Sequence, residues 1–199
     1  MNPDLLSALI LAGGQGRRMN GADKGLLKLE DTAFAERLTR MFRPHCLHVL
    51  ISCNRNSDIY RQMADISFED QESGFPGPLQ GLESARPHLS TPWLLVTPCD
   101  TPRLDARYVT RMTEGLDDTP VSIRVAHDGT RLQNLHLLVH RRDLDVLHEY
   151  LERGQRSVWG WLETAGYTPV DFSDCPELFM NVNTPEDLSR LKTPNPPRA

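Results

Sequence analysis

The feature that most constrains this chain is a short apolar segment that runs directly into a glycine-rich loop. Residues 7–12 predict a buried strand, and Gly13, Gly14 and Gly16 follow it at once. Glycines let backbone N–H groups come close to an anion because no Cβ is in the way. Successive N–H groups in such a turn form a concave site for phosphate oxygens. The sequence therefore indicates a phosphate-binding loop at the end of a first strand.

Cationic side chains follow this loop within a few residues. They are Arg17, Arg18 and Lys24, the only concentrated basic stretch of the chain. The loop is neither of the common nucleotide motifs, since Ala12 occupies the first glycine position of GxGxxG and no Ser or Thr follows Lys24. Three glycines alone would suggest an ordinary turn, and the cations alone a solvated surface. Together they favour the binding of a small, highly charged anion.

Apolar runs and segments with helical spacing alternate along the rest of the chain. We expect strands at residues 7–12, 47–52, 65–69, 93–97, 121–126, 135–140 and 168–172, and helices at 34–42, 59–64, 107–116 and 144–151 and beginning at 79 and 184. This alternation predicts an α/β fold, a doubly wound and mostly parallel sheet in a single domain at residues 1–192. The near-continuous apolar run at 93–97 predicts a central parallel strand covered on both faces. Residues 193–199 are rich in proline and predict a disordered tail.

Composition excludes several classes of protein. A net charge of -5 with mixed signs argues against a nucleic-acid-binding surface. No apolar run approaches the roughly 20 residues that a membrane helix requires, and the N-terminus lacks the basic and apolar regions of a secretory signal. The four cysteines form no CxxC pair, so we expect reduced thiols in a cytoplasmic protein.

Candidate site residues fall just past the expected strands. Ligands of doubly wound sheets bind at the carboxyl ends of the strands, where Gly13, Ser52, Asp70 and Asp100 lie. Asp100 stands between two prolines and is a candidate Mg²⁺ ligand, because Mg²⁺ takes one or two carboxylates and completes its shell with water and phosphate oxygens. An aspartate there could also cap the next helix. Asp70 could assist the metal, contact a nucleoside or only begin a loop.

Two other groups of residues have ordinary interpretations. His136 and His140 have a zinc-like spacing only on a helix, but they fall on an expected strand, which indicates structural or surface roles. Trp159 and Trp161 could stack on a ring system, although packing in a core or against a partner is the commoner use.

Several segments together resemble one family. They are Leu11–Met19, Asp23–Leu26, residues 74–81, Pro98–Pro102 and Asn181–Leu188. The first resembles the signature loop of the nucleotidyltransferases, whose fold is Rossmann-like. The combination resembles the molybdenum cofactor guanylyltransferases, which transfer GMP from GTP to molybdopterin, and it covers roughly residues 7 to 191.

This resemblance implies roles for individual residues. It implies that GTP is bound by Leu11, Ala12, Gly13, Lys24, Ser52, Asp70 and Asp100. Asp100 would also bind Mg²⁺, Lys24 would contact the phosphates, and Arg18 would neutralise the departing pyrophosphate, which makes these three the catalytic set. Ser52 stands where family members can carry asparagine, with Asn54 two residues later. Asn181 and Asn183 would lie on the pterin side of the cleft.

The implied partners are GTP and molybdopterin, with transient contacts to cofactor-synthesis proteins, molybdoenzymes or their chaperones. Two other readings stay open. One is a related transferase that uses CTP or activates a sugar phosphate. The other is a nucleotide-gated carrier of the cofactor, which would bind GTP without releasing pyrophosphate.

Overall fold

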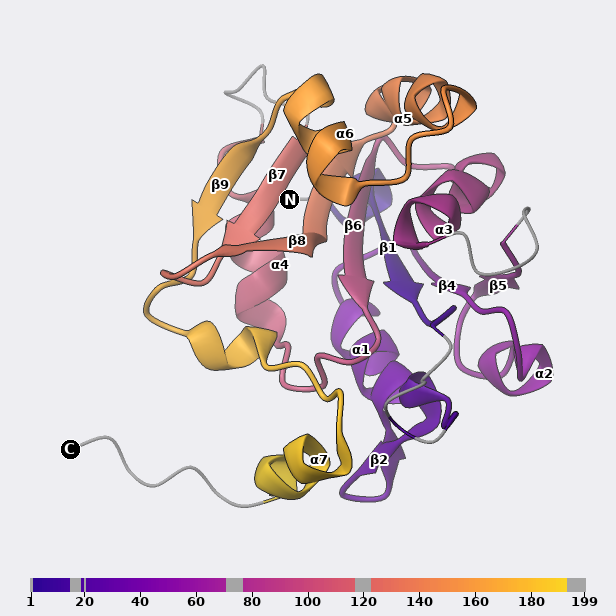
Figure 1. The fold of residues 1–199 in the computed structure, drawn as a ribbon, viewed down its shortest axis with the longest axis vertical. Helices are drawn as coiled ribbons and strands as arrows, with labels where there is room; N and C mark the ends of the chain where they lie inside the picture. The colour runs from indigo at the N-terminus through magenta and orange to yellow at the C-terminus, as the bar shows by residue number, and fades with distance from the viewer. Residues whose placement is uncertain (1, 15–18, 20, 71–76, 117–122, 193–199) are drawn as a thin grey trace.

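The computed structural model describes residues 2–14, 19, 21–70, 77–116 and 123–192. Its centre is a seven-stranded sheet of order β5-β4-β1-β6-β8-β7-β9, with helices on both faces (Figure 1). The strands are β1 Leu6–Leu11, β4 His48–Ser52, β5 Ile66–Phe68, β6 Trp93–Pro98, β7 Ile123–His127, β8 Leu132–His140 and β9 Thr168–Asp171. The helices are α1 Phe34–Phe42, α2 Ser57–Tyr60, α3 Pro78–Ala85, α4 Ala106–Thr113, α5 Asp143–Glu152, α6 Val158–Ala165 and α7 Pro185–Lys192. The predicted α/β class and mostly parallel sheet are confirmed, while the expected tail at 193–199 lies outside the described residues.

The sheet has a parallel part and an antiparallel part. Strands β5, β4, β1 and β6 run parallel to one another, whereas β8 runs antiparallel to both β6 and β7. The expectation of a central parallel strand at 93–97 is therefore right for one neighbour of β6 and wrong for the other. At the predicted turn after β7, the Asp128 carboxylate accepts from the backbone N–H groups of Thr130 and Arg131, and the chain returns as β8. The returning strand, and not β7, lies beside β6, which makes that pair antiparallel.

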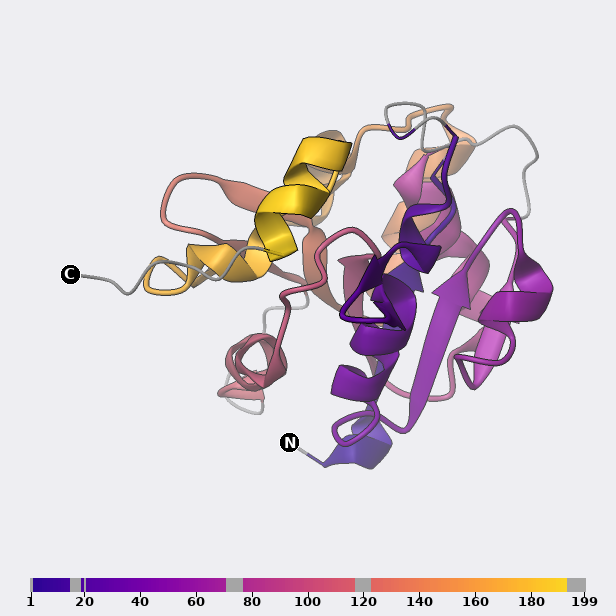
Figure 2. The same cartoon turned by 90° about the horizontal axis from the view of Figure 1, so that it is seen from below.

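Two apolar layers cover the sheet. On one face, α1 and α4 pack on side chains such as Ala8, Ile10 and Leu95. On the other, α3, α5 and α6 pack on Leu9, Val96 and their neighbours. Consecutive residues of each central strand thus point into different cores, which explains why these strands are apolar without alternation. Figure 2 shows the sheet from below with the α7 segment at one side.

The helices agree with the sequence in most places. α1 has the predicted bounds, but α2 is shorter and begins earlier than the expected 59–64. α6 was not predicted; the Ser157 hydroxyl caps it by accepting from the Gly160 N–H, and its Trp161 is fully buried. α7 begins as predicted, with the Asp187 N–H donating to the Thr184 hydroxyl at 3.1 Å.

Small elements lie at the carboxyl end of the parallel strands. After the glycine-rich loop the chain makes a 3-10 turn, η3 Lys24–Leu26, and a hairpin of β2 Lys28–Leu29 and β3 Thr32–Ala33. A small apolar cluster joins this hairpin to α1 and α7 through Leu29, Phe34, Val182 and Leu191. The N-terminal loop and the C-terminal helix are therefore held on the same side of the molecule.

The cysteines lie inside the fold as thiols. All four cysteines are buried and free, and burial raises the pKa of the Cys53 thiol to about 11. Such thiols stay protonated at neutral pH.

Within the described ranges, no helix has the length and apolar character needed to cross a bilayer.

Candidate functional site

Strand register places the candidate residues at one level of the sheet. Leu11 at the end of β1 pairs with Ser52 of β4 and with Pro98 of β6, and Ser52 pairs in turn with Phe68 of β5. Two residues beyond these four ends come Gly13, Asn54, Asp70 and Asp100. Because parallel strands end at the same edge, these residues gather there, as the rule for doubly wound sheets predicts.

Asp70 is held by hydrogen bonds to both of its carboxylate oxygens. The Ser52 hydroxyl donates to its Oδ1 at 2.8 Å, and Asn54 Nδ2 donates to its Oδ2 at 2.7 Å. The Asp70 N–H donates back to Asn54 Oδ1 at 3.0 Å. Ser52 is only 1% exposed, so its hydroxyl lies beneath Asp70 and holds that carboxylate. Asn54, two residues past the position where family members can carry asparagine, bonds to Asp70 on both sides of its amide.

Two glycines allow the backbone to approach this carboxylate. A Cβ added to Gly13 would lie 2.9 Å from Asn54 Nδ2, and one added to Gly81 of α3 would lie 2.9 Å from the Ser52 Oγ. Both distances are shorter than real Cβ contacts, so larger residues would push the loop or the helix away. Ala12, which precedes Gly13, is buried, and its N–H donates to the Ser52 carbonyl at 2.8 Å. We call Gly13, Ser52, Asn54 and Asp70 the nucleotide side.

Lys24 joins three distant parts of the chain. Its Nζ donates to Asp100 Oδ2 at 2.9 Å and to Asn183 Oδ1 at 2.5 Å. The Lys24 and Asp100 side chains are only 21% and 16% exposed, which strengthens their attraction relative to a surface pair. The backbone keeps the third partner close, because the Val182 N–H donates to the Asp100 carbonyl at 2.9 Å. The structure therefore brings together Lys24, Asp100 and Asn183.

A hollow of about 380 Å³ lies on the far side of Asp100 and is lined in part by Gln133, His136 and Asn181. We call these three residues the acceptor side. Among the described residues, two buried polar atoms here have no hydrogen-bond partner: Asn181 Oδ1 and His136 Nδ1. A buried polar atom without a partner costs free energy unless a ligand or water satisfies it. This wall of the site therefore suits a polar ligand.

His136 is neutral in this setting. Its Nε2 lies 3.1 Å from the Thr101 hydroxyl, and its ring meets Phe179 edge-on with centroids 4.9 Å apart. Burial lowers its pKa to about 3. It lies on a strand, so the ordinary structural interpretation of the His136–His140 spacing fits the fold.

One carboxylate in the site is free to meet a cation. Asp100 Oδ2 bonds to Lys24, while its Oδ1 has no hydrogen bond to any described residue. In the part of the chain that the structure describes, no three His, Cys, Asp or Glu side chains are grouped so that they could hold a metal ion. A single carboxylate beside a phosphate ligand is the donor set that Mg²⁺ uses when substrate oxygens and water complete its shell. The residues thus fit Mg²⁺ that arrives with a phosphate-bearing ligand.

Some expected site residues cannot be placed. Arg18 lies outside the described residues, as do Arg17 and positions 74–76 of the Gly74–Gly81 segment.

Comparison with known proteins agrees with this geometry. The sequence pattern of the MobA-like NTP transferase domain family matches residues 8–166. A molybdenum cofactor guanylyltransferase of Vibrio vulnificus is 40% identical over 191 residues, which is 96% of this chain and 97% of that protein. A protein of the same name from Shewanella amazonensis is 39% identical over 94% of this chain and 95% of its own length.

The chain belongs to the molybdenum cofactor guanylyltransferase family.

Solved structures support the fold of this guanylyltransferase-family chain. Molybdopterin-guanine dinucleotide biosynthesis protein A from Archaeoglobus fulgidus superposes with a TM-score of 0.77 at 19% identity, covering 94% of this chain and 96% of that one. The 2-C-methyl-D-erythritol 4-phosphate cytidylyltransferase of Thermus thermophilus superposes with a TM-score of 0.73 at 14% identity. The Rossmann-like nucleotidyltransferase architecture is therefore shared with proteins of different base preference.

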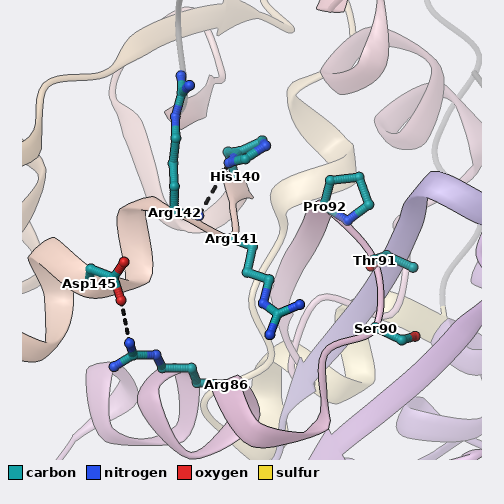
Figure 3. A pocket seen from close by; sticks show the side chains of 8 residues that line it. All are labelled: Arg86, Ser90, Thr91, Pro92, His140, Arg141, Arg142 and Asp145. Carbon is teal, nitrogen blue, oxygen red and sulfur yellow. Dashed lines mark hydrogen bonds and ion pairs between the residues drawn. The ribbon is translucent and has the colours of Figure 1, made fainter.

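A second hollow lies at the opposite end of the strands, where β6 begins and β8 ends (Figure 3). Arg86, His140 and Arg141 line it, and Arg86 pairs with Asp145 of α5. Its lining includes none of the residues expected to bind GTP or the pterin.

Two sets of contacts at this edge of the sheet were not predicted: those of Asn54 with Asp70, and that of Asn183, itself an expected site residue, with Lys24. Asn54 follows the expected strand at 47–52 by two residues, whereas Gly13 and Asp70 directly follow their expected strands, so its local signal was weaker. The contact of Asn183 with Lys24 spans 159 residues and has no local signal.

Proposed function

We propose that this chain transfers GMP from GTP to the terminal phosphate of molybdopterin, with Mg²⁺, and releases pyrophosphate. The observation that carries the proposal is the contact of Lys24 with both Asp100 and Asn183. It joins the segment after the phosphate loop, the candidate metal carboxylate and one of the two asparagines expected on the pterin side. The family relationship supplies the identity of the two substrates.

The nucleotide side would receive the guanosine end of GTP. The Asp70 carboxylate is fixed by Ser52 and Asn54 before any ligand arrives. A preorganised acceptor loses little conformational freedom on binding. The glycine at position 13 leaves the backbone bare beside it, so the loop can approach the ribose and phosphates.

The α-phosphate would lie between Lys24 and Asp100, with the acceptor phosphate in the hollow beyond. An oxygen of the molybdopterin phosphate attacks the α-phosphorus, the bond from that phosphorus to the β-phosphate oxygen breaks, and pyrophosphate leaves with the bonding electrons. A phosphate monoester is already anionic at neutral pH, so no general base is needed. Catalysis then consists of positioning and charge stabilisation.

Lys24 would exchange partners during binding. Its ammonium, now paired with Asp100, would turn to the phosphate oxygens and stabilise the charge that develops on them. When bound, Mg²⁺ would add a Lewis-acid charge at the phosphate oxygens, and Asp100 would hold it. Arg18 would give the leaving pyrophosphate a bidentate partner. Asn181 and Asn183 would meet the pterin substrate.

The setting follows from this activity. The substrates are GTP and molybdopterin, and the product would pass by transient contacts to molybdoenzymes, their chaperones or other cofactor-synthesis proteins in the cytoplasm.

Pyrophosphate release tests the proposal. Purified protein with Mg²⁺ is given GTP or CTP, each with and without molybdopterin, and pyrophosphate is measured. We expect release only with GTP and molybdopterin together, and loss of release with EDTA. Tight GTP binding without release would support the carrier instead, and preferred use of CTP would support a cytidylyltransferase. Undiminished release in EDTA would contradict the metal assignment.

A further inference from the structure

Arg55, just past β4, holds the two flanks of the glycine-rich loop. Its guanidinium donates to the carbonyl of Gly14 at 3.1 Å, to that of Gly21 at 2.7 Å and to that of Ala22 at 3.0 Å. Gly14 lies at the start of the loop, and Gly21 and Ala22 lie just before Asp23 and Lys24. One side chain therefore ties together two described backbone segments that are seven residues apart in the sequence.

Asp23 connects this clamp to Lys24. Its side chain is 7% exposed, and its Oδ2 lies 3.9 Å from Arg55 Nε. The same carboxylate accepts from Asn56 Nδ2 at 2.9 Å, from the Tyr60 hydroxyl at 2.5 Å and from the Gly25 N–H at 3.2 Å. With its oxygens fully used in this way, Asp23 does not compete with Asp100 for the neighbouring ammonium of Lys24.

Tyr60 supports Asp23 and the backbone after Lys24 from the protein interior. The residue is fully buried, and burial together with the Asp23 carboxylate raises the pKa of its hydroxyl, which stays a donor. A Cβ added to Gly25 would lie 2.3 Å from the Tyr60 Oη. The backbone after Lys24 is thus pressed against the tyrosine.

We propose that Arg55 is a positioning residue for GTP. It would hold the loop flanks and, through Asp23, the backbone of Lys24 in the conformation that receives the phosphates. The inference rests on the proposed function, because it names a further residue for the same site. Arginine suits the task, since its planar guanidinium carries five N–H donors in a fixed geometry, whereas lysine offers one point charge.

A purely structural role would give a different result. The Gly14 and Gly21 residues that Arg55 contacts are exposed, and no apolar core contact depends on them. Loss of the guanidinium should therefore affect the loop and leave the packing of the sheet intact. GTP affinity and global stability then separate in the test.

The test compares Arg55→Met with Arg61→Met. Arg61 is an exposed arginine six residues on that pairs only with Asp58 among the described residues, at 3.3 Å. GTP binding to each full-length variant is measured by calorimetry without molybdopterin, together with KM for both substrates and the melting temperature. We expect Arg55→Met to weaken GTP binding roughly tenfold or more, because bonds from a charged donor are lost. The KM for molybdopterin and the melting temperature should match those of Arg61→Met.

Two further measurements make the result decisive. Arg55→Lys should restore only part of the affinity, and amide hydrogen exchange in the segment 12–25 should rise in Arg55→Met while exchange in α5 stays constant. Should Arg55→Met fail to fold, Tyr60→Phe, which removes one hydroxyl, replaces it and should weaken GTP binding several-fold.

Unchanged GTP affinity in a folded Arg55→Met protein would overturn the positioning role and leave the proposed function standing. A parallel loss of both substrates and of melting temperature would show a structural role instead. If the unmodified protein binds no GTP, the proposed function fails first and the positioning role falls with it.

Discussion

The two sides of Asp100 differ in how their polar groups are satisfied. On the nucleotide side, Ser52, Asn54 and Asp70 bond to one another. On the acceptor side, Asn181 Oδ1 and His136 Nδ1 are buried without a partner among the described residues. The first arrangement is held by its own side chains, and the second has polar atoms left for a ligand to satisfy. Substitutions on the nucleotide side should therefore disturb a built geometry, whereas those on the acceptor side remove single contacts.

The largest effect is expected where the two sides meet, at Lys24. Lys24→Ala removes the charge that would stabilise the transferring phosphate, and comparable losses cost on the order of 10²–10³ in rate. Steady-state pyrophosphate release measures it, with the exposed Lys28→Ala as the matched control. Near-normal turnover in a folded Lys24→Ala protein would remove Lys24 from the mechanism.

Asp70→Asn tests the built geometry of the nucleotide side. An amide NH₂ would face the donors of Ser52 or Asn54, and the loss of bonds to a carboxylate corresponds to roughly 1.5–3 kcal/mol. We expect the KM for GTP to rise roughly tenfold to a hundredfold while the KM for molybdopterin stays constant. The exposed neighbour Glu69 provides the control variant Glu69→Gln. Equal increases in both KM values would show that the two sides are not separate.

His136 predicts a pH-dependent stability on the acceptor side. Its pKa is about 3 in the folded chain, against about 6.5 when unfolded. Above pH 6.5 the ring is neutral in both states. Below that value only the unfolded chain takes up the proton, so the free energy of unfolding should fall by about 1.4 kcal/mol per pH unit until the folded pKa is reached.

Urea unfolding at several pH values between 7 and 5 measures this slope. His136→Gln should flatten the slope, and the exposed His88→Gln should keep it. An identical slope in His136→Gln and the unmodified protein would contradict a neutral buried ring.

The smallest effect is expected at Asn181. Asn181→Ala removes one side-chain amide, and a neutral hydrogen bond contributes about 0.5–1.5 kcal/mol. The KM for molybdopterin should rise several-fold with the KM for GTP unchanged, the reverse of Asp70→Asn. A rise confined to the KM for GTP would contradict the assignment of Asn181 to the acceptor side.

Much of this molecule could be predicted from its residues. Apolar runs marked every strand of the main sheet, and Thr184 followed by Pro185 marked the start of α7, because these signals are local. Lys24 and Asp100 were both expected to meet one phosphate ligand, since Asp100 follows a strand end and Lys24 follows the loop that leaves another. Their direct contact was not expected.

The remaining features depend on distant packing. α6 begins at a weak signal around Ser157 and is stabilised by burial of Trp161 against the sheet. The antiparallel direction of β8 beside β6 follows from which strand the hairpin meets, a choice that no local pattern records. The clamp of Arg55 on Gly14 spans 41 residues, and an arginine after a strand has no local pattern that would reveal it.

The level register of β1, β4, β5 and β6 has a consequence for how such a chain can change. Side chains along a strand alternate in direction, so one added or deleted residue would reverse every side chain beyond it. In β4 this single step would turn Ser52 away from Asp70 and carry Asn54 off the common edge. Insertions and deletions should therefore be tolerated in the surface loops. Within these four strands, a change of length would displace the site residues that follow them.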